Sequence, residues 1–259
     1  MTEIAPDVFC LGPWGRTQTN VHLVRSGGGS ALVDAGWAGD ADRIRSAVRQ
    51  HLGGRATPAA IILTHVHPDH AGAARVLADE WRCPIVVHPL EVPIARGDFE
   101  AMARFAGPLD RWVILPMMRA IGERRRATVL GRNSLGGRLR ELASDGTVEG
   151  LEGWSWLATP GHTPGHVSLV RDRDRVVLTG DALLALRVNA LDGLLLGRQG
   201  LSPPPWYTTW DARAARSSIR ALAGLRPRVV GPGHGRPLTG ADTADAIEAF
   251  AGDGYDPSR

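Results

Sequence analysis

The sequence predicts an α/β protein in which sheets and helices form separate layers. Three observations indicate this class. Short apolar runs rich in branched residues alternate with longer stretches that carry apolar residues on one helical face. The apolar runs end at glycine, proline or polar residues, as strands do. The chain has 259 residues, 43% of them hydrophobic, so it can bury a sizeable core. Strands that alternate with helices in this way are typical of layered α/β folds.

The first third of the chain shows the alternation most clearly. Val21–Val24 and Ala31–Asp34 are predicted to form a hairpin around a serine and glycine turn. The spacing of Ile44, Val48 and Leu52 predicts a helix over residues 40–52. A strand, a helix and a second strand are predicted to follow, over Ala59–Leu63, Ala71–Trp81 and Pro84–Val87.

Residues 90–147 interrupt the alternation. They read as several short helices, with breaks at Pro108 and Pro116, and they form a helical insert. The stretch from Trp112 to Met118 is unusually apolar. It either covers the core or forms a pocket wall or the contact of a homodimer, and a single sequence does not separate these uses.

From Trp154 the alternation resumes. Three strands, a helix, a strand and a last helix are predicted over Trp154–Ala158, Val167–Val170, Val176–Thr179, Ala212–Leu225, Arg228–Val230 and about Ala241–Ala251. Both halves of the chain deliver polar side chains at strand ends. We therefore place no domain boundary and expect one domain over residues 1–259.

Composition excludes some functions. All 30 basic residues are arginine, so chemistry based on a lysine Schiff base is excluded. The densest basic segment, Arg119–Arg140, is interpreted as a solvated helical face, because the net charge is only +3 and aromatic residues are not interleaved. We expect no nucleic-acid partner.

The sequence also bears on location. Met1–Cys10 lacks the basic and apolar regions of a secretory signal, and no apolar run is long enough to cross a bilayer. Cys10 and Cys83 show neither metal-binding nor redox spacing and are expected to be small buried side chains. We expect a cytoplasmic protein that does not act at a membrane.

Four side chains suited to metals follow the strand predicted at residues 59–63. They are His65, His67, Asp69 and His70. Alternate side chains of extended backbone share a face, so the first two imidazoles point the same way. Pro68 stops the strand, and the next two side chains lie where the chain turns into a helix. Imidazole and carboxylate groups suit zinc and similar divalent cations, so this stretch predicts a metal site.

Three more candidate ligands lie in loops farther along the chain. His162, Asp181 and His234 each have small neighbours, which leave room for a cation and a substrate. His166 is expected to organise its loop by hydrogen bonding, and His88 is a candidate for the pocket wall.

The complete pattern, from Asp34-x-Gly36 to His234, resembles the metallo-β-lactamase superfamily. The resemblance implies a four-layer αββα sandwich with the site at one edge, between the sheets. It implies two divalent metal ions; we expect zinc, with iron or manganese as alternatives. Asp34 resembles an aspartate that orients a ligand histidine. By this resemblance His65, His67 and His162 hold one ion, Asp69, His70 and His234 hold the other, and Asp181 bridges both.

The resemblance also implies a hydrolase. A hydroxide that bridges the two metals attacks an ester, thioester or lactone carbonyl, and Asp69 orients the nucleophile and receives its proton. Apolar stretches at 99–130 and at 182–210, including Pro203–Tyr207, predict a small hydrophobic substrate.

Subfamily patterns match only in part. β-Lactamases lack the bridging carboxylate that Asp181 supplies. The ligand set and the 159–166 loop resemble glyoxalase II. Those enzymes usually carry a C-terminal helical part that helps to hold glutathione, and only 25 residues follow His234 here, so we do not expect a glutathione thioester as the substrate. Acyl-homoserine lactonases use a tyrosine where this chain has Ala182–Ala185.

Two alternatives to a hydrolase stay open. One is a persulfide dioxygenase with a single iron held by His65, His162 and Asp181. The other is a non-catalytic relative that only binds metal.

Overall fold

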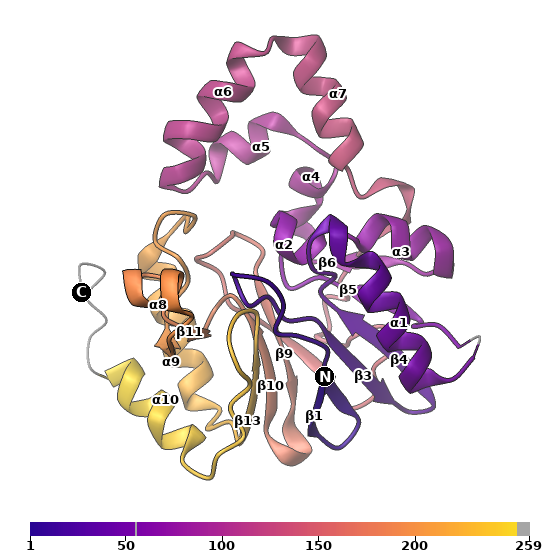
Figure 1. Ribbon diagram of the computed structural model, residues 1–259, viewed down its shortest axis with the longest axis vertical. Helices are drawn as coiled ribbons and strands as arrows, with labels where there is room; N and C mark the ends of the chain where they lie inside the picture. Colours follow the sequence, from indigo (N-terminus) through magenta and orange to yellow (C-terminus); the bar gives the residue numbers. More distant parts are fainter. Residues whose placement is uncertain (55, 253–259) are drawn as a thin grey trace.

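The computed structural model describes residues 1–54 and 56–252 and contains two large sheets (Figure 1). The first sheet has seven strands in the order β1-β2-β3-β4-β5-β6-β7. Its strands are β1 (Thr2–Ala5), β2 (Val8–Cys10), β3 (His22–Ser26), β4 (Gly29–Val33), β5 (Ala60–Ile62), β6 (Ile85–Val87) and β7 (Leu139–Glu141). Pairing is antiparallel from β1 to β4 and parallel from β4 to β7.

The second sheet has four strands in the order β13-β10-β9-β8. They are β8 (Ser155–Ala158), β9 (Val167–Arg171), β10 (Val176–Gly180) and β13 (Val229–Pro232). Only the β10–β13 pair is parallel. A small separate ribbon joins β11 (Leu184–Leu186) to β12 (Gln199–Ser202).

Side-chain alternation along the strands builds the layers. In β4, Leu32 faces one side of the first sheet while Ala31 and Val33 face the other, as the two-residue period of a strand requires. The second of these faces packs against Leu169 and Leu178 of the other sheet. Between the two sheets lies one continuous apolar core.

Helices cover the two outer faces. Ile44 and Val48 of α1 (Ala41–Leu52) and Leu77 of α3 (Ala74–Trp81) pack on the first sheet. Ile219 of α9 (Ala212–Gly224) and Ile247 of α10 (Thr243–Gly252) pack on the second. The order of layers is therefore helix, sheet, sheet, helix.

The expected helical insert protrudes beyond the sandwich as an arch (Figure 1). It contains η2 (Pro89–Glu91), α4 (Val92–Ala95), α5 (Phe99–Arg104), η3 (Asp110–Ile114), α6 (Leu115–Ala120), α7 (Glu123–Asn133) and η4 (Gly136–Arg138). The helices end before residue 147, because Leu139–Glu141 pairs in parallel with β6. The other short helices are η1 (Ala38–Asp40), α2 (Pro68–Ala71), η5 (Asp172–Asp174) and α8 (Leu191–Leu196).

Most of the strands and helices predicted outside the insert are present, with ends shifted by a few residues. Five strands were not predicted: β1, β2, β7, β11 and β12. Of the helices in the described residues, none has the length and apolarity needed to span a bilayer.

Candidate metal centre

Strand direction places the predicted ligands at one edge of the sandwich. Because β4 and β5 run parallel, Asp34 and His65 follow their carboxyl ends on the same side of the first sheet. Strands β10 and β13 also run parallel, so Asp181 and His234 follow their carboxyl ends on one side of the second sheet. His162 follows β8 in the loop that leads to β9. The edge where the two sheets meet thus collects side chains from both halves of the chain.

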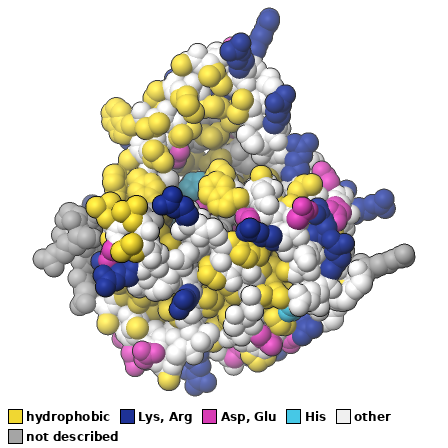
Figure 2. Space-filling view, in the orientation of Figure 1, with side chains coloured by type: hydrophobic (Ala, Val, Ile, Leu, Met, Phe, Trp, Pro, Cys, Tyr) yellow, Lys and Arg dark blue, Asp and Glu magenta, His cyan; other side chains and the backbone are white. Residues whose placement is uncertain are grey.

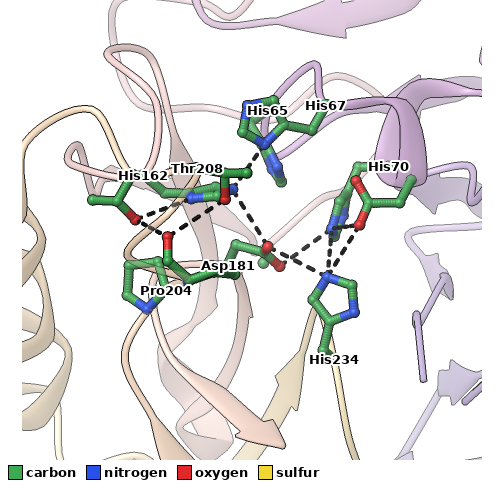
Figure 3. Close-up of polar contacts among 12 residues, drawn as sticks. His65, His67, His70, His162, Asp181, Pro204, Thr208 and His234 are labelled. Carbon is green, nitrogen blue, oxygen red and sulfur yellow. Dashed lines mark hydrogen bonds and ion pairs between the residues drawn. The ribbon is translucent and has the colours of Figure 1, made fainter. Parts of the chain in front are cut away.

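The structure brings all seven predicted ligand residues together (Figure 3). His65, His67 and His162 form one group that could hold an ion, with donor atoms within 4.8 Å of one another. The closest pair joins His67 Nδ1 to His162 Nε2 at 2.8 Å. This is the group that the resemblance assigned to the first metal.

Asp69, His70 and His234 form a second such group beside it. His234 Nε2 lies 3.3 Å from an Asp69 carboxylate oxygen and 3.4 Å from His70 Nε2. Asp181 lies between the groups: its Oδ1 is 3.2 Å from His70 Nε2, and its Oδ2 is 3.4 Å from His162 Nε2. One carboxylate therefore faces both groups.

The donor atoms at this edge are short of partners. His65 Nε2 and Asp181 Oδ1 are buried and make no hydrogen bond within the described part of the chain. Asp181 Oδ1 still faces His70 Nε2 at 3.2 Å, whereas His65 Nε2 has no such contact. Buried polar atoms are normally paired, so His65 Nε2 points to a ligand. Five imidazoles and two carboxylates match the preferences of zinc, iron(II) or manganese. The residues fit a pair of divalent cations.

The pKa values of four clustered histidines are shifted, two of them downwards and two upwards. Burial, together with neighbouring imidazoles, holds the pKa of His65 and of His162 well below its usual value. These two rings are therefore neutral, with lone pairs free for a cation. Metal ligation requires this neutral form.

His70 and His234 behave in the opposite way. Burial alone would lower their pKa values, but the carboxylate of Asp181 and other nearby carboxylates raise the pKa of His70 well above its usual value and that of His234 to about 10. Burial acts to raise the pKa of Asp181, yet the His234 and His70 charges hold it well below its usual range. In the polypeptide alone, protons on these histidines balance the carboxylates. Cations that bind here would displace those protons.

Four of the histidines are oriented through Nδ1. A hydrogen bond to one ring nitrogen fixes the ring and leaves the other nitrogen for the metal. The pairs are His70 with Asp34 at 2.9 Å, His65 with the Thr64 hydroxyl at 3.1 Å, His234 with the Thr17 carbonyl at 2.7 Å and His162 with the Thr209 hydroxyl at 3.5 Å.

Asp34 acts as expected from the resemblance, since its carboxylate holds His70. It also accepts hydrogen bonds from the Thr64 backbone N–H at 2.8 Å and from the Thr64 hydroxyl. The Asp34 backbone has φ 62°, a left-handed conformation that costs energy for a side chain other than glycine. This conformation turns the chain at the strand end.

Glu91 is a residue that sequence reasoning missed. Its side chain is fully buried, and its two oxygens accept the backbone N–H groups of Gly165 at 2.8 Å and Val66 at 3.2 Å. It therefore ties the loop of His65 and His67 to the loop of His162. The sequence signalled nothing special at this position, because a single glutamate in a polar turn is usually exposed.

Two further histidines, His166 and His88, make different kinds of contact. His166 is buried; its Nε2 accepts the Asp181 backbone N–H at 2.9 Å, and its Nδ1 lies 2.9 Å from the Thr159 hydroxyl. It organises the loop, as expected. His88 is not among the clustered residues: its Nδ1 accepts the Leu90 N–H and its ring packs against Trp156.

A glycine lets the loops approach closely. A β-carbon built on Gly233 would lie 2.2 Å from Asp181 Oδ1 and 2.9 Å from His70 Cε1. No side chain fits in that space. The glycine before His234 is therefore required by the packing of the ligand side chains.

Comparison with known proteins gives a family match over most of the chain. The sequence profile of the metallo-β-lactamase superfamily matches residues 14–234. A probable metallo-hydrolase of Bacillus subtilis, YflN, is 36% identical over 220 residues, which cover 85% of this chain and 80% of that protein. A second probable metallo-hydrolase of Bacillus subtilis, YqjP, is 29% identical over 184 residues, 69% of this chain and 54% of that protein.

Solved structures show the same fold. A metallo-β-lactamase family protein from Thermus thermophilus, TTHA1429, superposes with a TM-score of 0.66 at 23% identity, over 97% of this chain and 80% of that one. TTHA1623, solved in a di-iron-bound form, superposes with a TM-score of 0.56 at 30% identity, over 87% of this chain and 92% of that one. The expected four-layer αββα sandwich is confirmed.

Proposed function

The chain belongs to the metallo-β-lactamase superfamily, and we propose that it is a dinuclear hydrolase of esters, thioesters or lactones. Relatives that carry the name probable metallo-hydrolase support this proposal. One observation carries the proposal. Seven side chains from loops of both sheets converge, and the buried His65 Nε2 among them makes no hydrogen bond within the described residues. A fold-stabilising zinc site is usually a closed set of four ligands, which this wider set does not resemble.

The residues take the following roles in the proposal. His65, His67 and His162 would hold one ion, Asp69, His70 and His234 the other, with Asp181 between them. When bound, two such cations lower the pKa of a shared water towards 7 and polarise the substrate carbonyl. Zinc is our first choice, and the di-iron form of TTHA1623 keeps iron as an alternative.

Asp69 is proposed as the catalytic carboxylate. Its side chain is 20% exposed, whereas those of Asp181 and His70 are at most 3% exposed. It is therefore the carboxylate that a substrate can approach. From this position it can orient the attacking water and accept its proton.

We propose a small hydrophobic substrate. Apolar side chains gather over the α5 and α6 side of the insert, while arginines lie along the α7 side (Figure 2). Trp112 and Trp206 are 77% and 52% exposed. A contiguous exposed apolar patch, unlike a single exposed apolar side chain, commonly marks a binding site.

The free, buried thiols of Cys10 and Cys83 fit a reducing compartment, so we propose the cytoplasm as the place of action.

Metal analysis combined with substrate assays tests the proposal. We expect about two divalent ions per chain and hydrolysis of apolar esters, thioesters or lactones. An Asp181→Asn variant should lose activity by about 100-fold or more, since one bridging charge is removed, while an exposed control such as Glu123→Gln should keep it. One iron per chain with oxygen uptake would instead indicate the dioxygenase. A fully metallated chain that hydrolyses none of these compounds would leave only metal binding.

A further inference from the structure

A recess of about 230 Å³ lies beside the candidate metal centre, between residues 106–112 of the insert and the segment before α9. Aromatic and proline side chains form most of its wall. We call it the aromatic recess and define it by Arg111, Trp112, Pro204, Trp206, Thr209 and Trp210.

The two walls of the aromatic recess are fixed to each other. The Leu109 N–H donates to the Tyr207 carbonyl at 2.7 Å. A β-carbon on Gly107 would lie 2.6 Å from the Thr208 carbonyl carbon, so the two backbones touch. The Phe105 ring packs edge-on against the ring of Trp210, a wall residue, with centroids 5.2 Å apart. The recess is therefore formed before any ligand arrives.

Asn189 holds the proline-rich wall. Its side-chain amide donates to the carbonyls of Pro203 at 3.3 Å and Pro204 at 3.2 Å. Its carbonyl oxygen accepts the Trp206 N–H at 3.0 Å. One side-chain amide thus sets the path of this wall.

The recess shares a wall with the ligand residues. Thr209 lines it, and the Thr209 hydroxyl lies 3.5 Å from His162 Nδ1. The Trp210 N–H donates to the His162 carbonyl at 3.2 Å. Burial, and then the Asp181 and Asp69 charges, raise the pKa of the neighbouring Tyr207.

The lining indicates the chemistry of the ligand. A cavity of about 150 Å³ holds a benzene ring, so 230 Å³ accommodates one ring with a short substituent. Indole and proline surfaces favour a flat apolar group. Arg111 donates to the Ala106 carbonyl at 3.3 Å and makes no ion pair with any described residue. Its remaining donors can take an anion.

We propose that the aromatic recess binds an aromatic or alicyclic ring of the substrate, and that Arg111 pairs with a negatively charged group on that ring. That the bound ring belongs to a substrate rests on the proposed function. The ring then lies against Thr209 and Pro204, one side chain away from His162. The recess selects which ester, thioester or lactone is held with its carbonyl at the metal centre.

Binding of phenylmethanesulfonate to the full-length, metal-loaded protein tests the recess directly, with neutral benzyl alcohol as the uncharged comparison. The sulfonate is chosen because it coordinates metals weakly. We expect calorimetric binding of both probes with quenched tryptophan fluorescence. Arg111→Met should weaken sulfonate binding about tenfold and change benzyl alcohol binding less than about twofold. Trp112→Ala should weaken the binding of both probes. Arg119→Met and Met117→Ala, which change exposed side chains elsewhere on the insert, should leave the binding of both probes unchanged.

Activity separates this inference from the proposed function. If the probes bind as expected but no ester is hydrolysed, the proposed function fails and the recess stands as a ligand site. If esters are hydrolysed, kcat/KM for esters with a charged aryl group should fall in Arg111→Met. Equal kcat/KM in Arg111→Met and Arg119→Met, or absence of probe binding, would overturn the recess assignment.

Discussion

Buried side chains that contact no substrate set the geometry of the candidate metal centre. Glu91 accepts backbone N–H groups from Val66 and Gly165 and so fixes the distance between His67 and His162. Both oxygens of this carboxylate are needed as acceptors, because each takes one of the two backbone N–H groups. An amide at this position would turn an N–H₂ group towards one of those N–H groups.

Glu91→Gln should therefore lower metal affinity about 10-fold to 100-fold, the usual cost of losing a group that supports ligands. The measurement is a zinc titration against a competing chelator. Glu123→Gln, an exposed substitution on α7, serves as the matched control. Equal affinity in the two variants would show that Glu91 has only a packing role.

His22 makes a pH-dependent contribution to stability. Burial lowers its pKa to about 4, and its Nε2 has no partner among the described residues. Between about pH 6.5 and 4, the unfolded chain takes up a proton here and the folded chain does not, so stability falls as pH falls through this window. The full loss is on the order of 3 kcal/mol.

His22→Leu should remove this contribution, so that its free energy of unfolding decreases less between about pH 7 and pH 4.5 than that of the unaltered protein. Urea unfolding in the presence of a chelator measures this slope without a contribution from metal release. His51→Gln, a substitution in the last turn of α1, is the control. Parallel slopes for all three proteins would contradict the assignment.

The seven clustered candidate ligands and Asp34 could be picked out from the sequence, but most other groups that hold these side chains could not. His65, His67 and Asp181 stand out because metal-capable residues follow apolar strands. Thr209 and Glu91 act on the ligands only through the folded chain, from far along the sequence. No local pattern marks a buried glutamate or threonine of this kind.

At the scale of elements, α9 begins next to a ligand loop. Asp211 caps it by accepting the N–H groups of Arg213 at 2.8 Å and Ala214 at 3.0 Å. The Asp211 N–H donates to the Gly161 carbonyl at 2.9 Å, beside His162. The cap therefore stabilises the helix and also fixes where the His162 loop meets it.

Asp211→Ala should cost about 1 kcal/mol in the free energy of unfolding, whereas Asp211→Asn keeps an acceptor and should cost much less. Urea unfolding at constant metal concentration measures both. A loss of the same size in the two variants would mean that the charge, rather than the cap, is what stabilises α9.

Elements were predictable where their periodicity was strong. Alternation in β3 and β4 and the helical spacing in α1 specify these elements locally. In β7 the sequence is Leu-Arg-Glu, and its last two residues are exposed, so it forms a strand only because β6 lies beside it. The β11–β12 ribbon likewise depends on pairing between distant residues. Tertiary pairing overrides weak local preference in such edge strands.

At the scale of the whole molecule, the centre joins two halves that fold around different sheets. His65 to His70 come from the first sheet, and His162, Asp181 and His234 from the second. The apolar core between the sheets holds these halves together away from the edge. At the edge itself, buried imidazoles and carboxylates meet, and some of their atoms make no hydrogen bond within the described residues. Cations that bind there would add stability that the core does not supply.

Metal removal should therefore lower the melting temperature of the whole protein. A cation at about 1,000 times its Kd stabilises the folded state by about 4 kcal/mol. For a chain of this size that corresponds to roughly 10 °C. Scanning calorimetry with and without a zinc chelator measures the shift, and added zinc should restore the original value. Asp181→Asn should reduce the gain from zinc, because both ligand groups lose the carboxylate that lies between them. An unchanged melting temperature in protein that has demonstrably released its metal would show that the two halves do not need cations to stay joined.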